Sequence, residues 1–323
     1  MRTAVLVPCY NEEKTIAKVV SDFLAVLPDA TVYVCDNAST DKTAEVARRA
    51  GAIVQHEPLR GKGNVVRRMF ADVEADVYVL VDGDDTYDVS RAPELVRTLV
   101  DDRLDMVTGR RSTDVKAAYR RGHKLGNRVL SGLVRSTFGD RVVDMLSGYR
   151  VLSRRFVKSF PALSKGFEIE TELTVHALEL RMPMAEVETQ YKERPEGSVS
   201  KLNSYRDGLR ILRVIMLLIK EERPLQFFSF IFLVLALTSI GLAVIIIIEF
   251  LQTGLVPRIP TAILSTSMML LAFLSLAVGL TLDTVTRGRQ EMKRLVYLGI
   301  PGISSAMDAK CKEEISPKKL ANE

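Results

Sequence analysis

Acidic side chains follow three short apolar runs in the first 85 residues. The runs are Thr3–Val7, Thr31–Cys35 and Val77–Val81, and the carboxylates that follow them are Glu12, Asp36, Asp82 and Asp84. Two carboxylates that flank one small residue can bind a hard cation such as Mg²⁺ or Mn²⁺, which keeps places for substrate phosphates. Such a cation offsets negative charge that grows on a leaving phosphate group. Asp82 and Asp84 are therefore candidate metal ligands, while Asp85 is a further ligand or a helix N-cap, of which we favour the cap.

The order of apolar and helix-forming segments predicts how these side chains are positioned. Strands are expected at the three runs above and at Ala52–Gln55, and helices are expected at about 13–27, from about residue 40 to 49, and at 63–73. This alternation is typical of a mainly parallel sheet with helices on both faces. In such sheets ligands bind beyond the carboxyl ends of the strands, where the acidic side chains fall.

Two long apolar runs near the C-terminus have the length of membrane spans. Residues 227–248 and 262–282 contain no charged side chain, and at about 1.5 Å per residue each covers the roughly 30 Å hydrocarbon core of a bilayer. The link between them contains Gly254, Pro257 and Pro260, which favour a turn. A buried hairpin of a soluble protein is the alternative, but soluble helices rarely stay uncharged over this length. We therefore expect a two-helix transmembrane hairpin.

Charges beside the two runs predict their orientation. Basic residues precede the first run (Lys220, Arg223) and follow the second (Arg287, Arg289), whereas the link carries Arg258 alone. The positive-inside rule then places both ends of the hairpin in the cytoplasm. The predicted segments are a cytoplasmic α/β domain at 1–203, an amphipathic interfacial or juxtamembrane helix at 204–224, the hairpin at 225–285 and a cytoplasmic basic tail at 286–323. The expected location is the inner or plasma membrane, with more than one pass.

Composition limits the partners of the chain. It has 323 residues and a net charge of +5, a mild basic excess that fits lipid headgroups or phosphates. Charges of mixed sign without an aromatic–basic motif argue against nucleic acid. Three cysteines, at positions 9, 35 and 311, give no disulfide framework and no metal-ligand spacing, which suits a reducing cytoplasm. Whether protomers pair is left open.

A series of motifs gives the chain a specific resemblance. The strings VLVPCYNEE, VCDNASTDKT, GKGNVVRRMF and VLVDGDDTYD are followed by SGYRVLSRRF, GFEIETEL and RPEGSVSKL. In this order, over about residues 1–215, they resemble the motifs of family-2 glycosyltransferases. The most similar branch includes dolichol-phosphate mannose synthase and bacterial polyprenyl-phosphate glycosyltransferases. The resemblance implies the nucleotide-diphospho-sugar transferase fold, an α/β fold with a mainly parallel, Rossmann-like sheet, here followed by the transmembrane hairpin.

The resemblance implies a donor site made of the same strand ends. Asp82 and Asp84 would form the metal-binding D-x-D motif around Gly83, with Mg²⁺ or Mn²⁺ as cofactor and Asp84 among the catalytic residues. A solvated turn is the alternative for this pair. The nucleoside pocket would be lined by Pro8, Tyr10 and Glu12, and Asp36 would hydrogen-bond the base. For Asp36 a turn or capping role is the alternative.

Basic side chains and one glutamate complete the implied site. The resemblance places Lys62 and Lys201 with the donor, and Arg110, Arg194 and Lys201 on donor diphosphate or acceptor phosphate. Arginine suits this role because its planar fork binds phosphate oxygens bidentately. Alternatives are a surface-turn lysine for Lys62 and a solvated basic face for the others. Glu172 would form the floor of the acceptor site, or would serve only as a partner of the helix dipole.

Four departures from the family pattern bear on the donor. Asn37 and Ala38 stand where the family usually has Asp and Gly, and Gly83 replaces an alanine that is frequent in the mannose branch. Thr86 stands near a position that is often glutamine in that branch. These changes put GDP-mannose in doubt and make a uridine nucleotide at least as well supported.

The predicted function is an inverting transfer of a sugar from a UDP- or GDP-linked donor to a polyprenyl phosphate at the cytoplasmic membrane face. Such a phosphate needs no general base, because its second pKa is about 6 and it is already anionic at neutral pH. One alternative is a glycosyltransferase acting on a soluble or saccharide acceptor. Another is a non-catalytic nucleotide-sugar-binding membrane protein, which the presence of both Asp82 and Asp84 disfavours.

Overall fold

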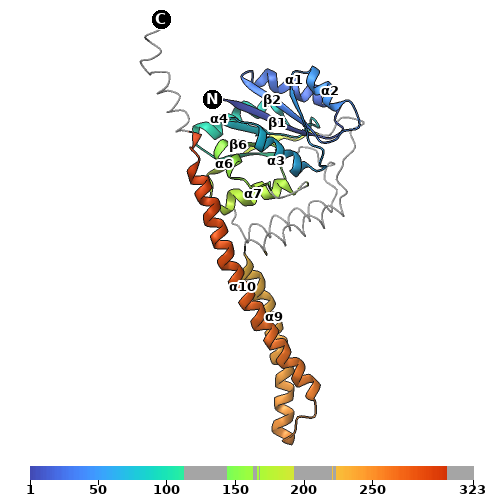
Figure 1. Cartoon of the computed structure of the whole chain (residues 1–323), viewed down its shortest axis with the longest axis vertical. Helices are drawn as coiled ribbons and strands as arrows, with labels where there is room; N and C mark the ends of the chain where they lie inside the picture. Colours follow the sequence, from blue (N-terminus) through green and yellow to red (C-terminus); the bar gives the residue numbers. More distant parts are fainter. Residues whose placement is uncertain (113–143, 163–165, 167, 193–219, 221–222, 304–323) are drawn as a thin grey trace. The chain divides into compact units, whose positions relative to one another are not determined.

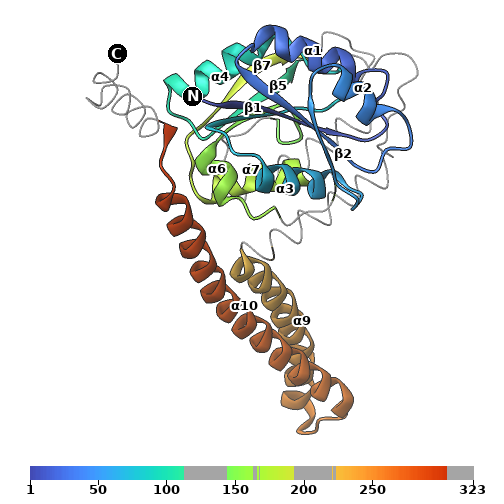
Figure 2. The same ribbon diagram turned by 45° about the horizontal axis from the view of Figure 1, so that its top comes forward.

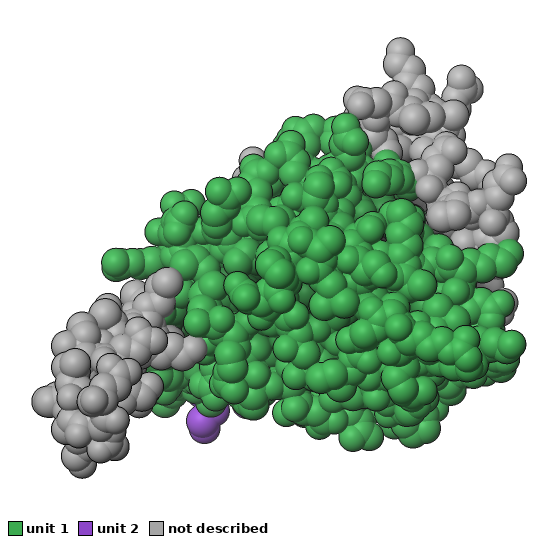
Figure 3. Space-filling model, turned by 90° about the horizontal axis from the view of Figure 1, so that it is seen from above, with its two compact units in different colours: residues 1–209, 293–323 green, residues 210–292 purple. Residues whose placement is uncertain are grey.

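A computed structural model describes residues 1–112, 144–162, 166, 168–192, 220 and 223–303. The chain divides into two compact units, distinguished by colour in Figure 3. Unit 1 comprises Met1–Leu209 and Lys293–Glu323, and unit 2 comprises Arg210–Met292. The predicted boundary between 203 and 204 and most of the predicted helix at 204–224 lie outside the described residues.

Unit 1 is built on a seven-stranded sheet with the strand order β3-β2-β1-β4-β6-β5-β7 (Figure 1). The strands are β1 Thr3–Cys9, β2 Ala30–Asp36, β3 Ile53–His56, β4 Val77–Leu80, β5 Met106–Ser112, β6 Arg150–Ser153 and β7 Met184–Gln190. Strand β6 is antiparallel to both of its neighbours, and the other pairs are parallel. The predicted mainly parallel sheet is confirmed, and the antiparallel strand is an addition that the sequence did not indicate.

Helices cover both faces of this sheet (Figure 2). One layer consists of α1 Ile16–Val26, α2 Thr43–Arg49, the 3₁₀ helix η1 Val89–Arg91 and α4 Ala92–Asp101, and the other of α3 Lys62–Asp72, α6 Arg154–Ser159 and α7 Ile169–Glu179. Because both faces are covered, all four residues of β4 are buried. The first four strands and three helices lie within three residues of their predicted bounds.

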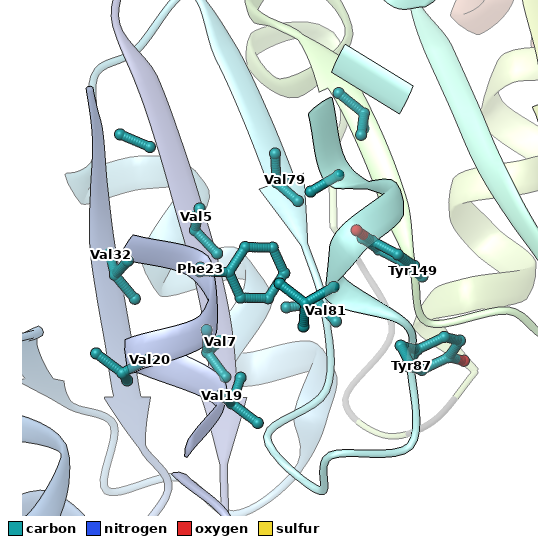
Figure 4. Close-up of a cluster of buried hydrophobic side chains, with 14 of the residues drawn as sticks. Val5, Val7, Val19, Val20, Phe23, Val32, Val79, Val81, Tyr87 and Tyr149 are labelled. Carbon is teal, nitrogen blue, oxygen red and sulfur yellow. The ribbon is translucent and has the colours of Figure 1, made fainter. Parts of the chain in front are cut away.

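Alternation along β1 divides the core into two clusters. Val5 and Val7 point to the cluster that contains Phe23 of α1 (Figure 4). Ala4 and Leu6 point to the cluster on the opposite face, with α3, α6 and α7. Successive strand residues face opposite sides, so one strand supports both layers. Each large apolar side chain buried in this way contributes roughly 1.5–3 kcal/mol.

Unit 2 contains most of two long helices, α9 Pro224–Thr253 and α10 Ile259–Gly299. Both are long and apolar enough to cross a bilayer, with mean hydropathy of 3.1 and 2.1 over their most apolar windows. Within the hairpin, the Ser239 hydroxyl donates to the Ser265 carbonyl oxygen at 2.7 Å, and the Ser265 hydroxyl donates to the Ser239 carbonyl oxygen at 2.9 Å. Such small polar residues let membrane helices approach closely. Helix α10 continues beyond residue 285, and from Lys293 onward its residues belong to unit 1.

Among the described residues other than glycine, three of the six that have a positive φ follow neighbouring strands. Asn11, Ala38 and Asp85 have φ angles of 52°, 55° and 57°, in the left-handed region, and they follow β1, β2 and β4 in turn. This conformation costs an alanine such as Ala38 roughly 1–2 kcal/mol, whereas asparagine and aspartate adopt it more readily. Strain of this kind is concentrated at functional sites, where the surrounding structure holds it in place.

Replacing Ala38 by glycine is expected to stabilise the protein. Glycine adopts a positive φ without a Cβ clash, so Ala38→Gly should raise stability by about 1 kcal/mol and the melting temperature by about 2–4 °C. Ala71 lies exposed in helix α3, where Ala71→Gly should have the opposite sign and similar size. Thermal unfolding of both variants measures this contrast, and two shifts of the same sign would contradict it.

Candidate active site

The carboxyl ends of β1, β2 and β4 meet at one edge of the sheet. Strand β1 lies between the other two and is parallel to both, with Cys9 beside Asp36 in the register. Hydrogen bonds tie the loops together: the Asn37 amide donates to the Cys9 carbonyl at 2.8 Å, and the Thr15 hydroxyl donates to the Gly83 carbonyl at 2.7 Å. The structure thus brings the predicted residues of the first 85 positions to one place.

Lys62 lies between two carboxylates at this edge. Its ammonium forms ion pairs with Asp82, two residues beyond the end of β4, and with Glu170 of α7. Burial lowers the pKa of Lys62, but attraction to Asp82 and Glu170 outweighs burial and raises the pKa above its ordinary value. Lys62 is therefore a fixed cation inside the site, which disagrees with the alternative of a surface-turn lysine.

Asp84 and Asp85 have different surroundings. Asp84 is 4% exposed, and its Oδ1 accepts from the Thr86 hydroxyl at 2.6 Å. Asp85 forms a 2.7 Å ion pair with Lys18 of α1. Because this carboxylate is paired with a lysine, the structure gives no support to Asp85 as a third metal ligand. The bonds described for Asp85 also include no helix-capping bond, which is the role that the sequence favoured.

The donor atoms of Asp82 and Asp84 fit a hard divalent cation. No cluster of three or more acidic, histidine or cysteine ligands occurs in the part of the chain that the structure describes. Mg²⁺ does not require one, because it is commonly held by one or two carboxylates together with substrate phosphates and water. The side chain of Asp82 is 30% exposed and remains open to a ligand.

Gly83 is enforced by packing against strand β1. A Cβ at this position would lie 2.6 Å from the Cys9 Sγ, far inside van der Waals contact. The glycine therefore has a local steric cause that is independent of the sugar. Its replacement of the family alanine consequently carries less information about the donor than the sequence comparison implied.

Asn37 fixes the loop that precedes Lys62. Its side-chain amide donates to the carbonyl oxygens of Glu57 at 2.9 Å and Leu59 at 2.8 Å, while its Oδ1 accepts from the Gly61 amide at 2.7 Å. An ionised aspartate has no hydrogen to donate and cannot make the first two bonds. Asparagine at this position thus has a structural reason, and it sets the start of α3, which begins at Lys62.

Asp36 carries a buried acceptor oxygen beside the predicted nucleoside pocket. It is 5% exposed; its Oδ2 accepts from the Ser39 amide at 3.3 Å, but its Oδ1 has no hydrogen-bond partner among the described residues. A buried acceptor of this kind is normally satisfied by protein, water or a ligand, and the contact of Asp36 with the base stays a prediction. The guanidinium of Arg60 lies over the ring of Tyr10, 5.2 Å from its centroid.

Pro8 lies near the end of β1, and Glu12 lies in the loop that follows this strand. Pro8 is opposite Cys35 in the register of β1 and β2. The Glu12 amide donates to the Thr43 hydroxyl at 2.8 Å, and its carbonyl accepts from Ile16 at the start of α1. The backbone at Glu12 therefore ties α1 to α2 beside the predicted nucleoside pocket, and its side-chain role remains a prediction.

The two arginines at the end of β5 differ in their environment. Arg110 forms a 2.8 Å ion pair with Glu188, and both side chains are more than a third exposed. Arg111 donates one hydrogen bond to each carboxylate oxygen of Asp144, both at 2.8 Å, and its guanidinium lies over the Tyr191 ring. Neighbouring strand residues face opposite sides of the sheet, so the two arginines point in different directions. The sequence analysis selected Arg110, whereas Arg111 has the more buried side chain. The role of Arg110 in the site stays a prediction.

The remaining predicted residues fall in two groups. Glu172 is buried in α7 at 8% exposure, and residues two apart on a helix do not share a face. It is Glu170, and not Glu172, that contacts Lys62, and the sequence analysis missed this residue. Arg194 and Lys201 lie outside the described residues.

A surface hollow of about 260 Å³ lies beside α1 and η1 and is lined by residues that include Asp22, Tyr87, Ser90 and Lys192. It contains none of the predicted donor residues, so we base the site on the carboxylates and not on this hollow.

Comparison with known proteins identifies the family. The family model described as glycosyl transferase family 2 matches residues 4–160. Glycosyltransferase AglJ of Haloferax volcanii is 33% identical over 297 residues, which cover 91% of this chain and 97% of AglJ. The chain belongs to glycosyl transferase family 2. It is therefore a glycosyltransferase, as the motifs predicted.

Two further relatives of this family-2 glycosyltransferase bear on its substrates. The dolichyl-phosphate hexose transferase of Haloferax volcanii is 29% identical over 221 residues, covering 68% of this chain and 95% of that protein. Glucosyl-3-phosphoglycerate synthase of Mycobacterium tuberculosis, solved with Mn²⁺ and UDP-glucose, has a TM-score of 0.56 and 25% identity and covers 68% of this chain and 78% of its own. The expected fold is thus confirmed.

Gly148 gives a direct test of the glycosyltransferase site. A Cβ at Gly148 would lie 2.5 Å from the Asp82 Oδ2 and 3.1 Å from the Lys62 Nζ. Gly148→Ala should displace this ion pair and lower kcat/KM by about a hundredfold, the usual effect of a displacement of about 1 Å. Gly288→Ala is the matched control, because a Cβ there meets nothing within 4 Å. Normal turnover by a folded Gly148→Ala variant would contradict the assignment.

Proposed function

We propose that this glycosyltransferase moves a sugar from a UDP- or GDP-linked donor to a polyprenyl phosphate at the cytoplasmic membrane face, with inversion at the anomeric carbon. The observation that carries the proposal is the combination, in one chain, of the strand-end site and two helices able to cross a bilayer. The similarity to a protein named dolichyl-phosphate hexose transferase supports a lipid phosphate acceptor.

The donor is proposed to bind across the ends of β2, β1 and β4. The Asp36 Oδ1 would supply a buried acceptor for a base N–H, and the end of β1 with Pro8 and the following loop with Tyr10 and Glu12 lie beside it. A uridine nucleotide is favoured by the structural similarity to an enzyme solved with UDP-glucose. Because Asn37 and Gly83 each have a packing reason, they do not exclude GDP.

Asp82 and Asp84 would hold Mg²⁺ or Mn²⁺, which, when bound, supplies charge compensation to the leaving nucleoside diphosphate. Lys62 adds a second, built-in positive charge at the same place. These groups act electrostatically in a partly buried site, where charges interact more strongly than in water. The chain's contribution is to fix the donor and its leaving group before transfer.

The acceptor phosphate is proposed to be the nucleophile itself. Its oxygen attacks the anomeric carbon, the bond to the nucleoside diphosphate breaks, and no proton has to be removed, because the phosphate is anionic at neutral pH. Arg110, Arg194 and Lys201 are the proposed phosphate contacts. The positioning of donor and acceptor and the compensation of their negative charges would then account for the rate of transfer without a general base.

A soluble acceptor is the second candidate. It is favoured by the structural similarity to glucosyl-3-phosphoglycerate synthase, whose name specifies a soluble acceptor. Transfer to such a hydroxyl would require a general base, for which Glu172 is the first residue to test. The two candidates differ in whether the acceptor needs a phosphate next to a long apolar chain.

Transfer from radiolabelled UDP- and GDP-sugars to polyprenyl phosphate, polyprenol and 3-phosphoglycerate separates the candidates. We expect label in polyprenyl phosphate and a rate on polyprenol lower by orders of magnitude, since only the phosphate supplies an anionic nucleophile at neutral pH. Comparable rates on polyprenol would show that the phosphate is not the nucleophile. Label in 3-phosphoglycerate alone would establish the soluble acceptor instead.

The proposed topology is tested by cysteine labelling from the two sides of the membrane. Val256 lies in the link between α9 and α10 and is 39% exposed, while Cys311 lies in the C-terminal tail. An impermeant maleimide should label Val256→Cys in intact cells and Cys311 only after permeabilisation, because basic flanks stay in the cytoplasm. Labelling of both positions from the same side would refute the hairpin.

A further inference from the structure

Glu170 is a buried carboxylate that the proposed reaction does not use directly. Its side chain is 7% exposed, and its Oε1 contacts the Lys62 ammonium. Its other oxygen, Oε2, has no hydrogen-bond partner among the described residues. A buried carboxylate with one unsatisfied oxygen lowers the stability of the fold, so we expect a role of Glu170 in the site.

The backbone at Glu170 is held by a buried arginine. Arg150 is 0% exposed and donates to the carbonyl oxygen of Glu170 at 3.0 Å, to that of Met145 at 2.8 Å and to the Thr174 hydroxyl at 2.8 Å. The Thr174 hydroxyl also lies 3.1 Å from the Glu170 carbonyl, as donor. These hydrogen bonds hold the backbone of Glu170 in place, and the backbone in turn positions the side chain that contacts Lys62.

The two carboxylates around Lys62 differ in access. The Asp82 side chain is 30% exposed, whereas Lys62 and Glu170 are 8% and 7% exposed. A ligand that approaches the cluster thus meets Asp82 first. Glu170 is the more buried of the two partners of the ammonium.

This arrangement has a consequence for cation binding. When Asp82 binds a divalent cation, its carboxylate shares its charge with that cation and holds Lys62 less strongly. Without Glu170, Asp82 would be the one carboxylate partner of Lys62 among the described residues, and a buried ammonium that loses such a partner is strongly destabilised. With Glu170 present, Lys62 keeps a full carboxylate partner, so Asp82 is released at lower cost.

We infer that Glu170 is a positioning residue for donor binding: it retains the Lys62 ammonium so that Asp82 is free to bind a divalent cation together with a nucleoside diphosphate. This inference rests on the proposed function only in requiring a cation at Asp82. Glu170 acts through Lys62 and touches neither the cation nor the sugar. It is thereby distinct from Glu172, the glutamate that the sequence analysis selected.

The test measures Mn²⁺ affinity and not turnover. Mn²⁺ is titrated into the full-length protein with saturating UDP, or GDP where UDP does not bind, and free Mn²⁺ is followed by electron paramagnetic resonance. Glu170→Gln should raise the Mn²⁺ Kd by about tenfold to a hundredfold, as expected for a residue that orients a metal ligand from outside. Glu45→Gln, which removes the carboxylate of an exposed ion pair with Arg49, should leave the Kd unchanged.

A double-mutant cycle identifies the route of the effect. In the Lys62→Met background there is no ammonium to retain, so Glu170→Gln should change the Mn²⁺ Kd by less than about threefold. A Glu170→Gln effect of equal size with and without Lys62 would overturn the inference. Should Glu170→Gln fail to fold, Glu170→Asp, which keeps the charge on a shorter arm, should raise the Kd and lose that effect in the Lys62→Met background.

The outcomes also separate this inference from the proposed function. Asp82→Asn should abolish Mn²⁺ binding. If wild-type protein binds no Mn²⁺, or Asp82→Asn binds it normally, both the metal site and this inference are wrong. If Asp82→Asn loses Mn²⁺ while Glu170→Gln keeps the wild-type Kd, the metal site stands and only the positioning role of Glu170 is overturned.

Discussion

The ion pairs of the buried Lys62 ammonium are the interaction on which the geometry of the site depends. They join the start of α3, the end of β4 and the first turn of α7, segments that lie up to 108 residues apart in the chain. A lysine in this position is stable only if its partners are fixed as well, because an unpaired buried charge is costly. Asn37 fixes the loop before Lys62, and Arg150 fixes the backbone of Glu170. The polar network at this edge of the sheet therefore acts as a unit.

Local patterns predicted the first half of the fold well for a physical reason. Strands β1 to β4 are apolar runs with covered faces, and the helices between them show the matching periodicity, so short-range sequence determines both. Strand β6 and Glu170 depend instead on contacts between distant segments. Arg150 belongs to a motif seen in the sequence, but nothing local shows that its guanidinium is buried against the carbonyl oxygens of Met145 and Glu170. Likewise, only the phase of α7 determines that Glu170 and not Glu172 meets Lys62.

The departures from the family pattern illustrate how packing and specificity become confused in a sequence. Gly83 has a steric cause in Cys9, and Asn37 donates hydrogen bonds that an aspartate cannot make. Ala38 instead adopts a left-handed conformation at a cost, with φ of 55°. None of the three is therefore explained by the donor sugar alone. The Asp36 Oδ1 bears more directly on the proposed donor contact, because it is a buried acceptor without a hydrogen-bond partner among the described residues.

The end of the second long helix packs within unit 1. Helix α10 runs from Ile259 to Gly299, and its last residues belong to unit 1. There Tyr297 is buried, donates to the Asp105 carboxylate at 2.7 Å and lies under the Arg155 guanidinium. Asp105 directly precedes β5, the strand whose far end carries Arg110 and Arg111. Within unit 1, the end of α10 is thus held by a carboxylate and a guanidinium next to β5, and a single buried tyrosine makes both contacts.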